Sequence, residues 1–175
     1  MTSKLQKDLY RIHGYLLNKS EFIKEFLLHH EIRFLYFYRK DTNIINHLIL
    51  RKIRRKYGLE IYSKSIGYGL FLCHPYMITV SGNTIIGNNC NLNKGCTIGE
   101  EFRGKRLGSP IIGNNVWVGS NSTIVGKINI GNNVLIAPNT FVNTDIPSNS
   151  IVFGNPCKIK LKEDATRDYI NNIYE

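Results

Sequence analysis

The feature that most constrains this chain is a six-residue period that runs from residue 66 to residue 154. An α-helix would repeat its apolar positions about every 3.6 residues, and a half-buried strand about every two. A period sustained this long is typical of repeat architectures, in which each unit stacks only on its neighbours. An aliphatic residue opens nearly every block, and these block heads are Ile66, Leu72, Ile78, Ile86, Leu92, Ile98, Ile112, Val118, Ile124, Ile130, Ile136 and Val142, with Ile151 after a short break.

Six residues suit one short strand and one turn, so three blocks predict one coil of a prism whose faces are parallel sheets. The block heads are expected to point inward and fill the prism. Glycine followed by two asparagines recurs at residues 87–89, 113–115 and 131–133. Both residue types tolerate the left-handed backbone that tight corners need. The sequence therefore predicts a mainly-β fold of stacked coils with Gly-Asn-Asn corners.

Two insertions interrupt the period. The step from Ile78 to Ile86 is two residues too long, and the step from Ile98 to Ile112 is eight too long. The larger insert, residues 99–110, is polar, basic and contains glycine, so it is expected to loop out of the prism. Insertions in repeat proteins often lie on the binding face, and we expect the functional site near this loop.

Helical periodicity precedes the repeat and predicts an α-helical subdomain over residues 1–57. The pattern indicates one helix over residues 5–16 and a second that begins near Ser20, a good N-cap, and continues to residue 38. Residues 41–43 are expected to cap a third helix that ends before Gly58. Helices placed over the first coil would protect the open edge that a stacked prism exposes there.

The third helix ends in a basic cluster, Arg-Lys-Ile-Arg-Arg-Lys-Tyr at residues 51–57. Cations suit the negative end of the helix dipole, and a solvated face explains the cluster. The alternative is a site for an anionic lipid or polymer, so peripheral membrane contact stays open. The net charge of +10 favours some anionic partner.

The repeat domain is expected to span residues 58–160 and to be followed by a tail, residues 161–175. Pro156 should end regular strand pairing, and the tail is expected to form a short C-terminal helix. No signal-peptide pattern or membrane-length apolar run is seen, and the four cysteines show no Cys-x-x-Cys spacing. These features predict a cytoplasmic, reduced protein without disulfides or structural zinc.

Several stretches of this chain match a known family: residues 56–61, 66–70, 73–75, 86–98, 113–119 and 154–158. They resemble the hexapeptide-repeat, left-handed parallel β-helix acyltransferases of the serine acetyltransferase-like branch. Within that branch they look most similar to capsule and exopolysaccharide O-acetyltransferases. The resemblance implies a left-handed solenoid, acetyl-CoA as the donor, a homotrimer, and active sites between neighbouring prisms.

The resemblance points to His74, within Cys73-His74-Pro75, as the catalytic base. It is the only histidine of the repeat region. Acetyl transfer from a thioester to a hydroxyl needs a base that takes the hydroxyl proton, and imidazole suits that role near neutral pH. The alternative is a structural, hydrogen-bonding histidine.

The resemblance also suggests the residues that would surround His74. Glu60 lies near the place of the acidic residue that orients the catalytic histidine, although a surface glutamate would fit equally well. Backbone N–H groups near Gly99 would stabilise the oxyanion. Other family positions would hold the pantetheine arm and the phosphates of CoA, the lysines being alternatively solvated charges: Gly119, Ser120, Ala137, Pro138, Lys127, Lys158 and Lys160.

Two departures bear on the acceptor. Serine-specific members carry Asp where this chain has Cys73, and Arg-His where it has Gly108-Ser109 before Pro110. The loop cations could instead engage an acidic sugar; they are Arg103, Lys105 and Arg106. These departures predict O-acetylation of a saccharide hydroxyl on a capsule, O-antigen or exopolysaccharide precursor. The alternative is serine O-acetyltransferase of cysteine biosynthesis.

Two further function classes remain to be considered. A zinc carbonic anhydrase on the same prism would need three histidine ligands, and the repeat supplies one. A scaffold or nucleic-acid binder could use the basic cluster, but the loop and His74 argue against it. We therefore expect neither a metal nor a nucleic acid as a partner, and expect a saccharide acceptor that is acidic or lipid-linked.

Overall fold

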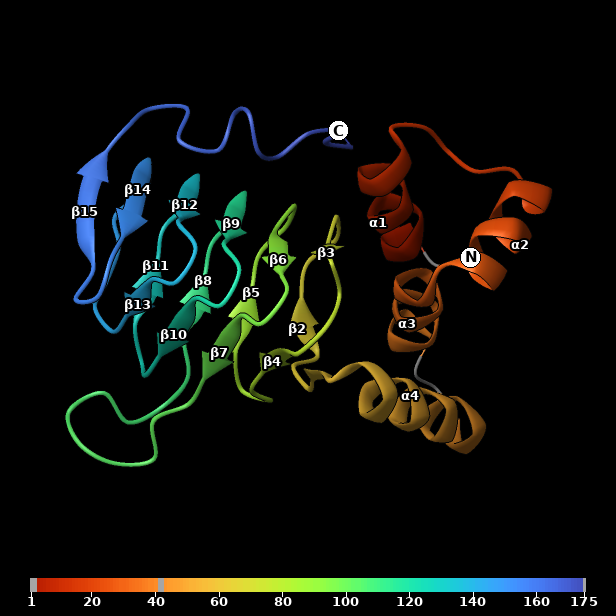
Figure 1. The fold of residues 1–175 in the computed structure, drawn as a ribbon, viewed down its shortest axis with the longest axis horizontal. Coiled ribbons are helices and arrows are strands. Elements are labelled where there is room, and N and C mark those ends of the chain that lie inside the picture. Colours follow the sequence, from red (N-terminus) through yellow and green to blue (C-terminus); the bar gives the residue numbers. More distant parts are fainter. Residues whose placement is uncertain (1–2, 41–42, 175) are drawn as a thin grey trace.

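The structure, a computed structural model, describes residues 3–40 and 43–174. Helices pack against one end of a parallel β-solenoid, and the loop after β7 projects from its side (Figure 1). No helix within the described residues is long and apolar enough to cross a membrane. The predicted mainly-β repeat with N-terminal helices is confirmed.

The helical end contains α1 (Ser3–His13), α2 (Lys19–Leu28), α3 (His30–Arg39) and α4 (Ile44–Tyr57). The prediction of one helix from Ser20 to residue 38 is wrong, because the chain turns to an extended backbone at His29 (φ −110°, ψ 119°). Its start is also earlier than predicted. Asn18 is the N-cap, and its side chain and that of Glu21 form a reciprocal capping box.

Helix α4 has the ends that the sequence predicts. The Asn43 side chain accepts a hydrogen bond from the Asn46 N–H, and Gly58 closes the helix in the left-handed conformation (φ 65°). The other two predicted cap residues, Asp41 and Thr42, lie outside the described residues.

The solenoid has three faces. Face 1 orders its strands β1-β4-β7-β10-β13, face 2 orders them β2-β5-β8-β11, and face 3 orders them β3-β6-β9-β12-β14-β15. All neighbours pair in parallel except β15, which returns antiparallel to β14. The bounds are β1 Leu59–Ile61, β2 Ser65–Ile66, β3 Phe71–Cys73, β4 Ile78–Val80, β5 Ile85–Ile86, β6 Asn91–Asn93, β7 Thr97–Gly99, β8 Ile111–Ile112, β9 Val116–Val118, β10 Thr123–Val125, β11 Asn129–Ile130, β12 Val134–Ile136, β13 Phe141–Val142, β14 Ser150–Phe153 and β15 Lys158–Leu161.

The core of the solenoid consists of the predicted block heads. All twelve from Ile66 to Val142 are at most 3 % exposed. The last head is wrong by one residue, since Val152 is fully buried and pairs with Ile136, while Ile151 pairs with the outward-facing Leu135. The short break before β14 shifts the register, and a one-residue shift reverses which side chains face inward.

Each residue of a Gly-Asn-Asn corner has its own structural role. The first asparagine builds a ladder, because the Asn114 side-chain oxygen accepts from the Asn88 N–H at 2.7 Å and Asn132 does the same for Asn114. The second asparagine has the predicted left-handed backbone, with φ 55° at Asn115. A Cβ on Gly113 would lie 2.6 Å from the Asn132 side-chain oxygen, so the glycine permits the close approach of coils.

The helices cover the first coil by hydrogen-bonding its free backbone groups. The Arg39 guanidinium donates to the carbonyls of Ile66 and Gly67, and it also pairs with Asp8 at 2.7 Å. Asp8 in turn accepts from the Leu70 N–H at 2.8 Å. Burial raises the pKa of the Asp8 carboxyl, and the Arg39 charge opposes that rise. The expected protection of the open edge is therefore achieved with charged side chains.

The tail does not form the predicted helix. After β15 it makes a run of turns and passes back along face 3 toward α1 (Figure 1). Left-handed backbone at Asp164 (φ 29°) and Asn172 (φ 54°) is incompatible with a continuous helix. Solenoid side chains also bind the tail directly, since the Asn133 side-chain oxygen accepts from the N–H and the hydroxyl of Thr166.

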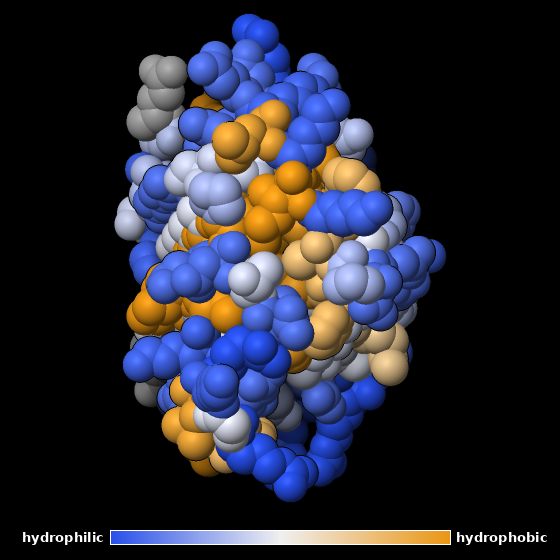
Figure 2. Space-filling model, turned by 90° about the vertical axis from the view of Figure 1, so that its left-hand side faces the viewer, coloured by the Kyte–Doolittle hydropathy of each residue, from blue (hydrophilic) through white to orange (hydrophobic). Residues whose placement is uncertain are grey.

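Among the residues that the structure describes, no helix covers the opposite end of the solenoid. Figure 2 shows apolar side chains gathered there, with polar side chains around them. The exposed apolar residues of the last strands include Phe153, Ile159 and Leu161. All four cysteines are free.

Candidate active site

His74 lies at the corner where face 3 passes to face 1, directly after β3. Its side chain is exposed, and its backbone is left-handed (φ 50°). Such a conformation is uncommon for residues other than glycine and asparagine, and the surrounding structure must hold it. Two backbone bonds do so, from the Tyr76 N–H to the His74 carbonyl at 2.7 Å and from the Met77 N–H to the Tyr57 carbonyl at 3.0 Å.

Helix α3 supports this corner through a second histidine. The His30 Nε2 lies 3.3 Å from the Pro75 carbonyl oxygen. The His30 ring stacks on Tyr57 with centroids 4.0 Å apart and contacts Tyr76 at 4.9 Å. No sequence pattern predicts this contact, because His30 and Pro75 are 45 residues apart.

Four predicted cofactor residues share the corner of His74 in later coils. They are Gly119 and Ser120 after β9, and Ala137 and Pro138 after β12. A Cβ on Gly119 would lie 2.5 Å from the Pro138 nitrogen, so this glycine is required by coil stacking. The Ala137 N–H donates to Val152, and its carbonyl accepts from two hydroxyl groups. The N–H and C=O groups of Ala137 are therefore both occupied, so Ala137 can contact a ligand by packing but has no free backbone group to offer it.

The insert forms a loop at the other edge of face 1, as the sequence predicts. It starts at Gly99, and the backbones of Glu101 and Gly108 exchange hydrogen bonds of 3.0 and 2.8 Å. Arg106 pairs with Glu101 at 3.3 Å, and this carboxylate partly neutralises the charge of Arg106. Arg103 and Lys105 are exposed in the loop.

The three lysines predicted to bind the CoA phosphates lie in two separate places. Lys127 lies beside the loop, where its N–H donates to the Arg106 carbonyl at 2.8 Å. Lys158 and Lys160 are exposed on β15, at the end of the solenoid. One chain therefore does not bring these three cations together.

Glu60 lies on β1 with its side chain exposed on face 1, opposite Thr79 in the register. Among the residues that the structure describes, no hydrogen bond or ion pair joins Glu60 to His74. The orienting role of Glu60 stays a prediction.

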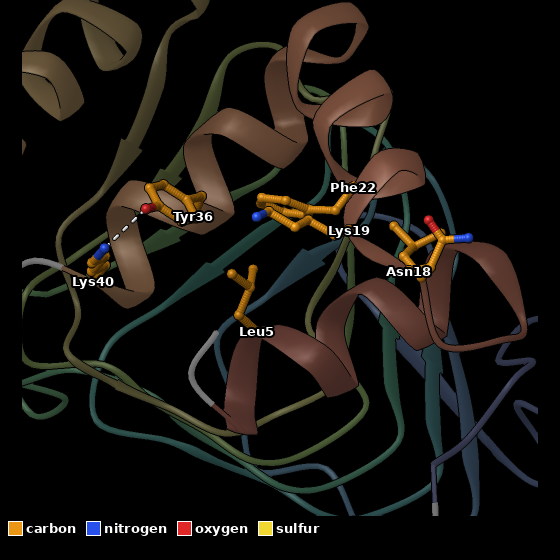
Figure 3. A pocket seen from close by; sticks show the side chains of 7 residues that line it. Leu5, Asn18, Lys19, Phe22, Tyr36 and Lys40 are labelled. Carbon is orange, nitrogen blue, oxygen red and sulfur yellow. Dashed lines mark hydrogen bonds between the residues drawn. The ribbon is translucent and has the colours of Figure 1, made fainter.

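A cavity of about 630 Å³ lies among α1, α2 and α3, and its lining residues all belong to the helical end (Figure 3). Its lining combines apolar and cationic side chains, and the Lys40 ammonium donates to the Tyr36 hydroxyl at 3.0 Å. No sequence pattern predicts this cavity, because its lining comes from three helices and the segments next to them. The lining residues are Leu5, Leu17, Asn18, Lys19, Phe22, Tyr36 and Lys40.

Comparison with known proteins agrees with the class that the fold defines. Residues 109–144 match the family described as bacterial transferase hexapeptide (six repeats). The matched residues lie within the six-residue period and the three-faced solenoid, so the chain is similar to the hexapeptide-repeat transferases in sequence and in fold.

The relatives within that class are serine acetyltransferases. The enzyme of Staphylococcus xylosus is 34 % identical over 144 residues, which cover 81 % of this chain and 63 % of that protein. Serine acetyltransferase 2 of Arabidopsis thaliana is 31 % identical over 70 % of this chain and 42 % of its own length. The chain thus spans less than two thirds of the length of either relative.

A solved structure gives the same picture. The serine acetyltransferase of Neisseria gonorrhoeae superposes with a TM-score of 0.74 at 26 % identity, over 91 % of this chain and 66 % of that one. The expectation of a saccharide O-acetyltransferase of the capsule type is wrong, because these relatives are serine acetyltransferases. The departures at Cys73 and Ser109 are local, whereas the similarity to this serine acetyltransferase extends over 91 % of the chain.

Proposed function

We propose that this chain is a serine O-acetyltransferase that transfers the acetyl group of acetyl-CoA to the hydroxyl of L-serine. The observation that carries the proposal is the exposed imidazole of His74 at a strained solenoid corner, in a chain whose relatives are serine acetyltransferases. One serine acetyltransferase of this fold is described in complex with serine and another in complex with CoA.

The chemistry follows from the position of His74. The imidazole takes the proton of the serine hydroxyl while the oxygen attacks the thioester carbon. The tetrahedral intermediate then collapses, the C–S bond breaks, and the CoA sulfur leaves and takes the proton from the imidazolium, which restores the neutral base. Proton transfer by a positioned base contributes about 10²–10⁴ to the rate. Backbone N–H groups near Gly99 are our candidates for stabilising the oxyanion.

The location of the remaining groups supports a site shared between two chains. His74 and the loop lie at opposite edges of face 1. In a three-fold assembly, the His74 corner of one prism can face the loop of the next. Arg103, Lys105 and Lys127 would then supply positive charge beside a CoA molecule lying in the crevice.

Cys73 sets a limit on how the acceptor is held. Burial raises the pKa of its thiol, so the side chain is neutral near pH 7. It therefore cannot pair with the ammonium group of L-serine as the aspartate of serine-specific members would. We expect Cys73→Asp to lower KM for L-serine more than it changes kcat.

The test is release of the CoA thiol from acetyl-CoA with L-serine as acceptor. We expect turnover in the usual enzymatic range, about 1–10³ s⁻¹. L-alanine, which lacks the hydroxyl, is the control. Thiol release with L-serine no faster than with L-alanine would refute the proposed function.

The shared site has its own test. We expect His74→Ala and a triple loop variant (Arg103→Ala, Lys105→Ala and Arg106→Ala) each to be impaired. Chains mixed by denaturation and refolding should regain activity, because some interfaces then combine an intact His74 with an intact loop. Sedimentation as a monomer, or mixtures no more active than the two variants separately, would contradict a shared site.

A further inference from the structure

Helix α4 has an exposed face that the proposed chemistry does not use. The opposite side of the helix is buried and carries Asn46, Leu50 and Ile53. The outward face carries apolar residues near its start and cations near its end, at spacings that put them on one side of a helix. The members of this face are Ile44, Ile45, Leu48, Arg51, Lys52, Arg55 and Lys56.

The apolar part of the α4 face is unusually open to solvent. Ile44, Ile45 and Leu48 are 71 %, 63 % and 57 % exposed. A solvated helix face explains cations but does not explain three large aliphatic side chains beside them. Contiguous exposed apolar surface is typical of a site that another surface covers.

The charge of the face restricts what can cover it. The segment Ile44–Tyr57 contains no acidic residue. Among the described residues, Arg51, Lys52 and Arg55 form no ion pair with a carboxylate. A second copy of the same face would bring like charges together, so the partner must be anionic.

We infer that the α4 face binds an anionic lipid bilayer, with the cations at the headgroups and the aliphatic side chains below them. A helix with basic residues and exposed aliphatic residues on one face suits the membrane interface. A nucleic acid would satisfy the cations but would leave Ile44, Ile45 and Leu48 in water. Binding to the bilayer surface does not require a membrane-spanning segment.

Vesicle sedimentation tests this inference with the full chain. We expect binding to phosphatidylcholine–phosphatidylserine vesicles mixed in roughly a 3:1 ratio, little binding to phosphatidylcholine alone, and weaker binding at high salt. The variant Arg51→Gln/Lys52→Gln/Arg55→Gln should bind roughly a hundredfold more weakly, since each cation near the surface contributes about fivefold.

A matched control removes the same charge elsewhere. The variant Lys24→Gln/Lys162→Gln/Arg167→Gln alters exposed residues outside α4 and should bind nearly as well as the unmodified chain. Equal loss in both triple variants would overturn the inference, because it would reflect net charge alone. All variants change exposed side chains, and circular dichroism should show an unchanged fold.

The aliphatic residues separate a bilayer from a polyanion. Ile45→Ser/Leu48→Ser keeps every charge and should weaken vesicle binding at least about tenfold, because apolar area is lost from the buried face. Unchanged vesicle binding by this variant, or equally tight binding of double-stranded DNA that ignores the substitutions, would overturn the inference.

Discussion

Asp8 holds the junction between the helices and the solenoid. Its side chain is fully buried and accepts hydrogen bonds from Arg39 and from the Leu70 N–H. Asp8→Asn should lower the free energy of unfolding by about 3–5 kcal/mol, because Arg39 would keep a buried charge without its counter-ion. Chemical denaturation followed by circular dichroism measures the change.

The control for this prediction is an exposed ion pair. Asp164 lies 3.0 Å from Arg167, and both side chains are mostly exposed. Asp164→Asn should change stability by less than about 1 kcal/mol, since exposed pairs contribute little. A similar effect of the two substitutions would contradict the structural role of Asp8.

The buried cysteines give a prediction about pH. Burial raises the pKa of the Cys90 and Cys96 thiols to about 12. Because the thiolate is the reactive form, both should resist iodoacetamide near pH 8 in the folded protein, while partly exposed Cys157 reacts. Labelling of Cys90 and Cys96 should rise only toward their pKa or on unfolding. Mass spectrometry that finds all three equally labelled at pH 8 would show that the core is open.

At the scale of the element, the corners depend on glycine. A Cβ at Gly113 would approach Asn132 and the Gly131 carbonyl to 2.6 and 2.8 Å. Gly113→Ala should therefore cost about 1–3 kcal/mol through overpacking. Gly82→Ala is the control, because no atom lies within 4 Å of its added Cβ. Thermal unfolding should separate the two; equal midpoints would mean that the coils can move apart freely.

The support of the His74 corner by α3 gives a second prediction at this scale. His30→Phe keeps a ring on Tyr57 but loses the hydrogen bond to the Pro75 carbonyl. We expect kcat to fall roughly ten- to a hundredfold, since small displacements of a catalytic group are costly. His30→Gln, which keeps a donor, should recover part of the rate. Thermal stability that falls in both variants while kcat holds would assign His30 a purely structural role.

The elements differ in how far sequence predicts them. The solenoid was predictable because its inward residues obey one local period, and α4 because Asn43 and Gly58 mark its ends. The break at His29 carries no glycine or proline that would mark it in the sequence, and the turns of the tail were not predictable because they depend on bonds to distant residues. The hydrogen bonds from Thr166 to Asn133 are an example.

At the scale of the whole molecule, the solenoid places motifs that are separate in the sequence at the edges of one prism. His74 and the loop were both predicted, but the period alone did not show that they lie at opposite edges of face 1. The predicted saccharide acceptor was wrong because single residues such as Cys73 do not define an acceptor site, which depends on all the groups around it. The sequence of one chain does not predict which side chains of a neighbouring chain would complete the site.

The central claim is that His74 activates the hydroxyl of L-serine for attack on acetyl-CoA. The most direct measurement compares CoA thiol release with L-serine for the unmodified chain and for His74→Ala, with the oligomeric state checked in both. The account predicts an unchanged fold and assembly, and a rate lower by at least about a hundredfold in the variant. A folded His74→Ala protein that acetylates L-serine at nearly the original rate would contradict it.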